Sequence, residues 1–229
     1  LALLFGAYWF LKDKKPAEDS TGDTAESIKL TDLTDDKISQ ISVENKDGVF
    51  VLEKKDTNWT LVSPTNIKAD PSKLSSISTN ASSIIADKLV EENPKDLSAY
   101  GLDKPVTVTI KLKEGGEKVV LIGNQTPTKG GYYAMMKSEA KVYVIDSYTA
   151  EKLLFSRNDI RDTTLYTIES TDVDSLSLDR NGTNVFTSKK TSDSEWAMLK
   201  PIEGNVNTTA IDPMLTALAG VKVKEFVED

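Results

Sequence analysis

The feature that most constrains the fold of this chain is an internal repeat. Trp196 follows Trp59 by 137 residues, and Pro201 follows Pro64 by the same 137. The same offset relates the run KLVEE at 88–92 to the run EFVED at 225–229. A constant offset over about thirty residues indicates one structural unit used twice, each copy burying its apolar face. The two tryptophans and the two prolines are therefore predicted core positions of the repeat.

The first copy is predicted to contain three strands, a helix and a further strand. Apolar residues alternate from Ile38 to Val43, a turn follows at 45–48, and the second and third strands are predicted at 49–53 and 59–62. Asp70 with Pro71 predicts a helix start, since Asp caps free N–H groups and Pro is pre-set for the first turn. The last strand spans 86–92.

Four shorter apolar runs follow the first copy. They lie at 106–112, 119–122, 132–136 and 142–145, and Asp146 is a predicted cap for a closing helix. This pattern predicts an antiparallel four-strand meander. The second copy begins near Val173 and ends at the point where the first copy enters its meander. Asn207 stands in the place of Asp70, and Pro213 predicts a kink or a restart in the second helix.

The predicted fold class is α+β, with antiparallel sheets, a few helices, a complete first repeat unit at 32–166 and a truncated second unit at 167–229. Residues 16–31 are acidic and lack an apolar period, which predicts a flexible linker. Residues 1–11 (LALLFGAYWFL) carry no charge and precede lysines. These eleven residues are too few to span a bilayer by themselves. Because aromatic residues and then lysines follow the apolar start, we predict that residues 1–15 are the end of a membrane anchor. A short buried helix is the alternative.

Composition narrows the possible chemistry. The chain has no Cys and no His, which excludes thiolate nucleophiles, catalytic triads with histidine, and cysteine or histidine metal sites. Its net charge of −8 argues against nucleic-acid binding. We find no phosphate-binding loop. Ser72 and Lys73 could suggest a Ser-Lys nucleophile, but adjacent residues point in different directions, so the pair is not expected to act together. We therefore expect no enzyme, no cofactor and no metal.

One surface stands out as a candidate partner contact. Tyr132 and Tyr133 alternate across a predicted strand, so their rings face opposite sides of the sheet. They follow the flexible pair Gly130 and Gly131. These four residues are the predicted contact, although a surface tyrosine on a strand is the simpler interpretation.

Several motifs carry a resemblance to a known family. They are the run YGL at 100–102 with Pro105, the run LIG at 121–123, the run GYY at 131–133 and the run VYVI at 142–145. With this spacing, the chain from Ile38 onward resembles the bacterial domain-of-unknown-function family DUF4340. The resemblance implies a membrane-anchored extracytoplasmic protein, associated with ABC transporters of the gliding-motility type. It implies no established activity, cofactor or catalytic residue.

The expected function is a non-catalytic, membrane-tethered binding or scaffold module outside the cytoplasm, accessory to an ABC transporter complex. The expected partners are the membrane, through the N-terminal anchor, and transporter subunits. Two alternatives remain at this stage: a module that binds an envelope polysaccharide or lipid, and a hydrolase that uses carboxylates. The hydrolase requires two carboxyl groups that converge in a cleft.

Overall fold

The structure is a computed structural model that describes residues 27–193 and 195–227. The predicted anchor at 1–15 lies outside the described residues. Among those residues, no helix has the length and apolar character needed to cross a membrane. They confirm the α+β class, with thirteen strands in antiparallel sheets and three α-helices. The chain divides into two compact units: residues up to Ser63 together with 75–154, and residues 64–74 together with 155–229.

The first unit is built on one nine-stranded sheet with the order β1-β5-β9-β8-β7-β6-β2-β3-β4. Its strands are β1 (Ile28–Asp32), β2 (Ile38–Asn45), β3 (Gly48–Lys55), β4 (Asn58–Ser63), β5 (Ser83–Glu92), β6 (Val106–Leu112), β7 (Glu117–Gln125), β8 (Gly131–Met136) and β9 (Lys141–Asp146). The predicted meander is present as β6 to β9. It lies inside the sheet, because β6 pairs with β2 and β9 pairs with β5.

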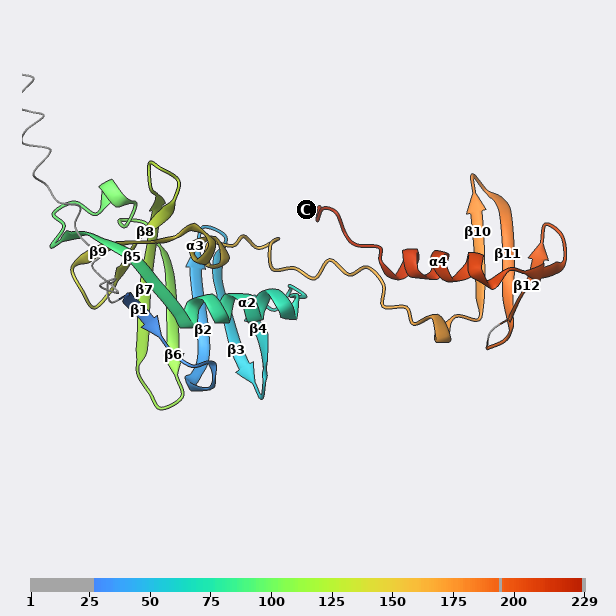
Figure 1. Cartoon of the computed structure of the whole chain (residues 1–229), viewed down its shortest axis with the longest axis horizontal. Coiled ribbons are helices and arrows are strands. Elements are labelled where there is room, and N and C mark those ends of the chain that lie inside the picture. The colour runs from blue at the N-terminus through green and yellow to red at the C-terminus, as the bar shows by residue number, and fades with distance from the viewer. Residues whose placement is uncertain (1–26, 194, 228–229) are drawn as a thin grey trace, which may run out of the picture. The chain divides into compact units, whose positions relative to one another are not determined.

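Two helices lie on this sheet (Figure 1). They are α2 (Pro71–Ser82) and α3 (Ser147–Leu153). Both begin at the caps predicted from the sequence: Asp70 accepts hydrogen bonds from the N–H and hydroxyl of Ser72, and Asp146 accepts one from the N–H of Thr149. Figure 1 shows α2 lying across β2, β3 and β4. The core between helices and sheet contains Ile41, Val43, Leu52, Ile77, Ala81, Val108, Ile110, Ile122 and Leu153, all at most 3% exposed.

A polar cluster around Asp35 joins the edge of the sheet to α2. The Asp35 carboxylate accepts hydrogen bonds from Trp59 Nε1 at 3.0 Å and from Ser78 Oγ at 2.8 Å, and it pairs with the Lys54 ammonium. Partial burial raises the pKa of Asp35, but the hydrogen bonds from Lys54, Ser78 and Trp59 outweigh it, so the pKa lies below its usual value. Trp59 is thereby a core residue with a satisfied polar end.

The second unit is smaller. Its four-stranded sheet consists of β10 (Ser175–Arg180), β11 (Thr183–Ser192), β12 (Glu195–Lys200) and β13 (Gly204–Val206), in that order. Helix α4 (Thr208–Ala219) follows and is capped by Asn207, as predicted. Trp196, Ile211 and Leu215 form the buried cluster between sheet and helix. Trp196 is therefore a core position, in agreement with the prediction.

Three predictions about the repeat need correction. Pro201 is exposed in the turn after β12, and Pro64 is only half-buried, so neither proline is a core residue. The run at 225–229 was predicted to be a strand, but its described part, 225–227, forms none. Instead an isolated bridge joins Lys222 to Thr164. For Pro213, which was predicted to kink or to restart the second helix, the restart is wrong, because Pro213 lies inside one continuous helix, α4; the kink stays a prediction.

The end of the predicted linker also needs correction. The linker was predicted to extend to residue 31, but β1 begins at Ile28 and pairs with β5. Leu30 and Thr31 are buried. The Thr31 hydroxyl donates a hydrogen bond to the carbonyl of Ala81 at the end of α2. These long-range contacts fix a segment that has little apolar pattern of its own.

Candidate functional site

The motif residues that carry the family resemblance gather on one face of the first unit's sheet. Leu102, Met135 and Val142 form a buried cluster, and four half-buried residues pack against it: Leu97, Tyr100, Leu121 and Tyr133. We call these seven residues the motif cluster. Leu121 and Ile122 are adjacent in β7, so they face opposite sides of the sheet. Ile122 belongs to the core between the helices and the sheet, so the motif cluster lies on the other face of the sheet.

The glycines of the motifs allow close packing of two backbone segments. Gly101 has a φ of 67°, in the left-handed region that favours glycine. A Cβ atom at Gly123 would lie 2.2 Å from the carbonyl oxygen of Tyr100. Any larger residue at 123 would push the 98–102 turn away from β7. The motif spacing thus reflects a structural requirement for packing.

Two half-buried tyrosines of the motif cluster contact each other. The rings of Tyr100 and Tyr133 lie edge to face, with 4.9 Å between their centroids and 70° between their planes. The Tyr100 hydroxyl donates a hydrogen bond to the Glu91 carboxylate, and this bond raises the pKa of Tyr100. Tyr133 is thus held in place from one side, while its other side borders open space.

That open space is a groove of about 600 Å³. One wall is β5 at residues 87–90, and another is the segment from Thr126 to Gly131 that joins β7 to β8. Tyr133 and Val144 also line it. Leu89 and Val90 are 38% and 39% exposed there, which is unusual for two adjacent large apolar side chains on a strand. The groove is open and is lined by both apolar and polar residues, the polar ones being Asp87, Lys88 and two threonines.

The predicted contact residues are partly brought together in this groove. Tyr133 lines it, while Tyr132 faces the other side of β8; both side chains are half-buried. Gly130 is exposed, whereas Gly131 is buried, and a Cβ there would lie 2.4 Å from the carbonyl oxygen of Ile145. Both glycines line the groove, so the contact predicted for them stays a prediction.

Sequence reasoning missed the rest of the groove. Residues 87–90 were predicted only as part of the last strand of the first repeat copy, and no role was predicted for residues 126–128. A strand with adjacent apolar residues at Leu89 and Val90 was the available signal, since one of the two must face away from the main core.

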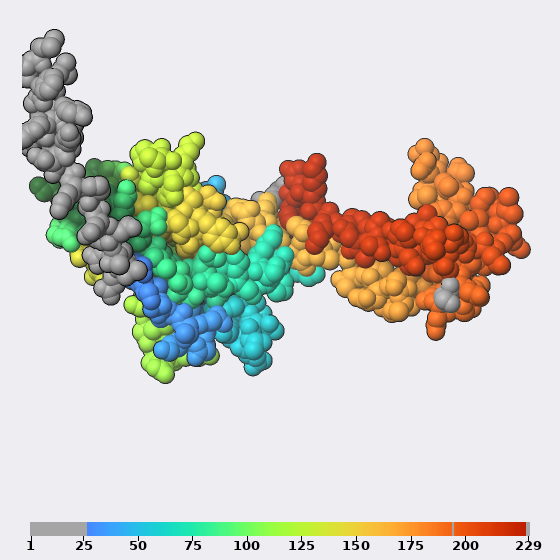
Figure 2. All heavy atoms as spheres, in the orientation of Figure 1, coloured from blue at the N-terminus to red at the C-terminus, as the bar shows by residue number. Residues whose placement is uncertain are grey.

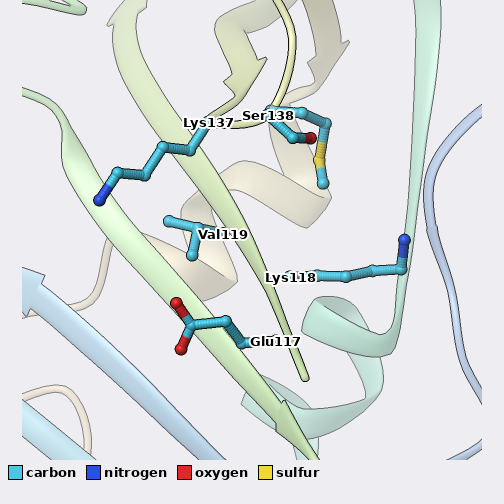
Figure 3. A pocket seen from close by; sticks show the side chains of 6 residues that line it. Glu117, Lys118, Val119, Lys137 and Ser138 are labelled. Carbon is cyan, nitrogen blue, oxygen red and sulfur yellow. The ribbon is translucent and has the colours of Figure 1, made fainter. Parts of the chain in front are cut away.

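A second, smaller hollow of about 290 Å³ lies at the start of β7 and the end of β8. Figure 3 shows the side chains of Glu117 and Lys137 on the same side of this hollow, with Val119 between them. Lys118 points the other way (Figure 3). The hollow is thus lined by one carboxylate and two lysines, at a solvent-exposed end of the strands.

Three of the carboxyl groups with a lowered pKa have hydrogen-bond partners close in the sequence. Hydrogen bonds from Ser72 lower the pKa of Asp70, and hydrogen bonds from Ser98 lower that of Asp96. Bonds from Ser156 likewise lower the pKa of Asp159. Each of these partners lies two or three residues from its carboxylate, as in capped turns. Within 27–193 and 195–227, no group of three or more acidic residues is placed to hold a metal ion.

The fold and the groove define an antiparallel α+β protein with an open groove on its larger sheet. The family described as "Domain of unknown function (DUF4340)" matches residues 59–229. The chain therefore belongs to this family. The match begins in β4, so β1, β2 and β3 precede it, whereas the resemblance in the sequence was expected to begin at Ile38. Comparison with curated proteins and with solved structures gave no match.

Proposed function

We propose that this protein is a non-catalytic, membrane-tethered binding module outside the cytoplasm, which docks a subunit of an ABC transporter complex through the groove of the first unit. The observation that carries the proposal is the apolar pair Leu89 and Val90, exposed beside Tyr133. Exposed apolar surface next to an anchored aromatic ring is typical of protein-binding sites. The transporter as partner, the anchor and the location rest on the family resemblance and on the apolar N-terminal segment.

Photocrosslinking in intact cells tests this proposal. A photoreactive benzoylphenylalanine at position 89 is expected to give adducts with transporter subunits, identified by mass spectrometry. Position 49 supplies the matched control, because Val49 is also exposed, at 47%, and lies in β3 away from the groove residues. Adducts from position 89 but not from position 49 support the proposal.

Other outcomes lead elsewhere. Adducts of position 89 with glycan or lipid would favour the alternative function, a module that binds an envelope polymer or lipid. Equal adducts from positions 89 and 49 would show that the groove has no special role, and the proposed docking site would have to be abandoned.

We further propose that the two units are copies of one β-β-β-α arrangement. β4 and β12 have the same length and start 137 residues apart, as do α2 and α4. Asp70 and Asn207 cap these helices in the same way. Each accepts hydrogen bonds from the N–H and the hydroxyl of the residue two positions later, at 2.9 and 2.6 Å for Asp70 and at 3.0 and 2.7 Å for Asn207.

The segments that flank the helices support the same proposal. In the first unit, β1 pairs with β5, and Ile28 lies opposite Ala86. The 137-residue offset places the counterpart pair at 165 and 223, and the structure has a bridge between Thr164 and Lys222. The second copy thus retains the pairing that follows the helix, shifted by one residue.

A further inference from the structure

We infer that Lys88, Lys129 and Gly130 make the groove of the first unit specific for a partner segment that carries carboxylates beside apolar side chains. This inference rests on the proposed docking function and names the chemistry of its partner. It is carried by two adjacent positions of the 126–131 segment. A lysine stands where the backbone favours glycine, and a glycine stands where backbone and packing require none.

The first observation is the backbone conformation of Lys129. Its φ is 58°, in the left-handed region that disfavours residues with a side chain. Hydrogen bonds fix this conformation: the Lys129 N–H donates to the carbonyl of Thr126 at 2.8 Å, and its carbonyl accepts from the Ser147 hydroxyl at 3.3 Å. Glycine would adopt this φ without steric cost, so local backbone energetics does not explain the lysine.

Gly130 is the reverse case. Its φ lies outside the left-handed region, and a Cβ atom there would meet only the Thr128 hydroxyl, at the ordinary contact distance of 3.8 Å. At Gly131, by contrast, the carbonyl of Ile145 leaves no room for a Cβ atom. Gly130 is exposed and lines the groove, within the part of the first unit whose surface Figure 2 shows. The missing side chain at 130 therefore keeps this wall of the groove open.

The other wall of the groove, β5, is shaped by two shifts in its pairing with β9. The register shifts once between residues 86 and 88 and once between 89 and 91, so Asp87 and Val90 are each an extra residue in β5. Bulges of this kind turn side chains out of the strict alternation of a strand. Both extra residues line the groove, together with Lys88 and Leu89. The bulges thus present four consecutive residues to it.

The charges at the groove indicate one part of the occupant. Lys88 lines the β5 wall, and the exposed Lys129 stands between two residues that line the other wall, Thr128 and Gly130. Within the described part of the chain, neither lysine forms an ion pair. Two ammonium groups against the single carboxylate of Asp87 make the groove locally positive, on a chain whose net charge is −8. Carboxylates on the partner complement this charge.

The apolar residues of the groove indicate the other part. Leu89 and Val90 require apolar side chains to remove them from water. Residues 16–26 of this chain (PAEDSTGDTAE) are acidic, but they contain no large apolar residue and so lack this second feature. The occupant that fits both features is a segment of a partner polypeptide in which apolar residues stand next to Asp or Glu.

The variant Lys129→Gly separates a binding role from a structural one. Because glycine relieves the positive φ, the urea midpoint of the purified chain is expected to rise. In intact cells, the yield of photoadducts between position 89 and transporter subunits is expected to fall by about twofold, the effect of losing one exposed ion pair. A lower urea midpoint for this variant would assign Lys129 to the fold and contradict the inference.

Further variants test the other two residues. The double variant Lys88→Gln and Lys129→Gln should lower the adduct yield by about fourfold, a factor of about two for each ion pair. Lys46→Gln, at an exposed lysine in the turn between β2 and β3, is the matched control and should leave the yield unchanged. Gly130→Leu should remove most adducts and leave the urea midpoint unchanged, because the new side chain enters the groove and meets no crowded atom.

Carbodiimide coupling in the same cells identifies the partner groups directly. The reagent activates a carboxyl group, and the Nζ amine of a nearby lysine then forms an amide with it. The water removed in this step converts the carbodiimide into a urea, so no other reactant is needed. The expected links join Lys88 or Lys129 to Asp or Glu of a transporter subunit, in the same segment that position 89 labels. Lys46 should give no such link.

The remaining outcomes separate this inference from the docking proposal. Adducts of position 89 with transporter subunits, at a yield that the double lysine variant leaves unchanged, would overturn the inference and leave the docking proposal intact. Links of the two lysines to residues 1–26 of the same chain alone would make that segment the occupant, and adducts with lipid or glycan alone would exclude a polypeptide; either result overturns the inference. Absence of any position 89 adduct would contradict both proposals.

Discussion

At the scale of single residues, Asp35 has the largest predicted effect. Replacing it by Ala leaves the Trp59 indole, the Ser78 hydroxyl and the Lys54 ammonium without their shared acceptor. We expect Asp35→Ala to lower the free energy of unfolding by about 2 kcal/mol, a value that allows for the half-exposed carboxylate. Urea titration followed by circular dichroism measures it. A loss no greater than that of an exposed control, Asp103→Ala, would contradict the role of this cluster.

The pH dependence of the Asp35 contribution follows from its lowered pKa. A carboxyl group with a pKa below its unfolded value of 3.8 stabilises the fold at pH values above 3.8, and this contribution is lost as the pH falls through the folded pKa. The difference in stability between the natural chain and Asp35→Ala should therefore be constant from pH 7 to about pH 5 and shrink at lower pH. Unfolding measured across this range at constant ionic strength tests the sign.

Ser188 is a second residue with a predicted effect. It is fully buried in β11, and its hydroxyl has no hydrogen-bond partner within the described part of the chain. Because an unsatisfied buried hydroxyl costs free energy, Ser188→Ala is expected to raise the free energy of unfolding of the second unit by about 1 kcal/mol. The exposed Ser192→Ala in the same strand is the control and should change stability little. A destabilising Ser188→Ala would show that the hydroxyl has a partner in solution.

At the scale of elements, the two helix caps provide a matched pair. Asp70→Ala and Asn207→Ala each remove the side-chain acceptor at a helix N-terminus, so each should cost about 1 kcal/mol at pH 7. The hydrogen bonds from Ser72 hold the pKa of Asp70 below its usual 3.8, so its contribution should decline as the pH falls through that region. The uncharged Asn207 should show no such decline. Equal pH profiles for the two variants would contradict the prediction that ionisation of Asp70 contributes to its helix cap.

At the scale of the whole molecule, the units differ in the core that each can bury. The first unit packs two helices on a nine-stranded sheet, whereas the cluster of the second unit consists of Trp196, Ile211 and Leu215. Because stability rises with buried apolar area, the second unit should unfold at lower urea concentration. Two variants, both carrying Trp9→Phe, report the units separately. With Trp196→Phe added, the fluorescence of Trp59 reports the first unit; with Trp59→Phe added, the fluorescence of Trp196 reports the second. Coincident midpoints would mean that the units unfold together.

The sequence by itself determined the local elements of this protein. Strand alternation, the turns and the helix caps at Asp70, Asp146 and Asn207 depend on neighbouring residues, so their pattern can be read along the chain. Burial of both repeat tryptophans could also be predicted, because their surroundings recur at a constant offset. The same reasoning failed for Pro201, which lies exposed in a turn.

The tertiary structure alone decided which strands meet and which surfaces stay open. Insertion of the meander between β2 and β5 depends on pairing between residues far apart in the sequence, and no local pattern specifies it. The groove at Leu89 arises from the same cause. Whether an apolar side chain is buried depends on whether a distant segment covers it, as the contrast between Val43 and Leu178 shows.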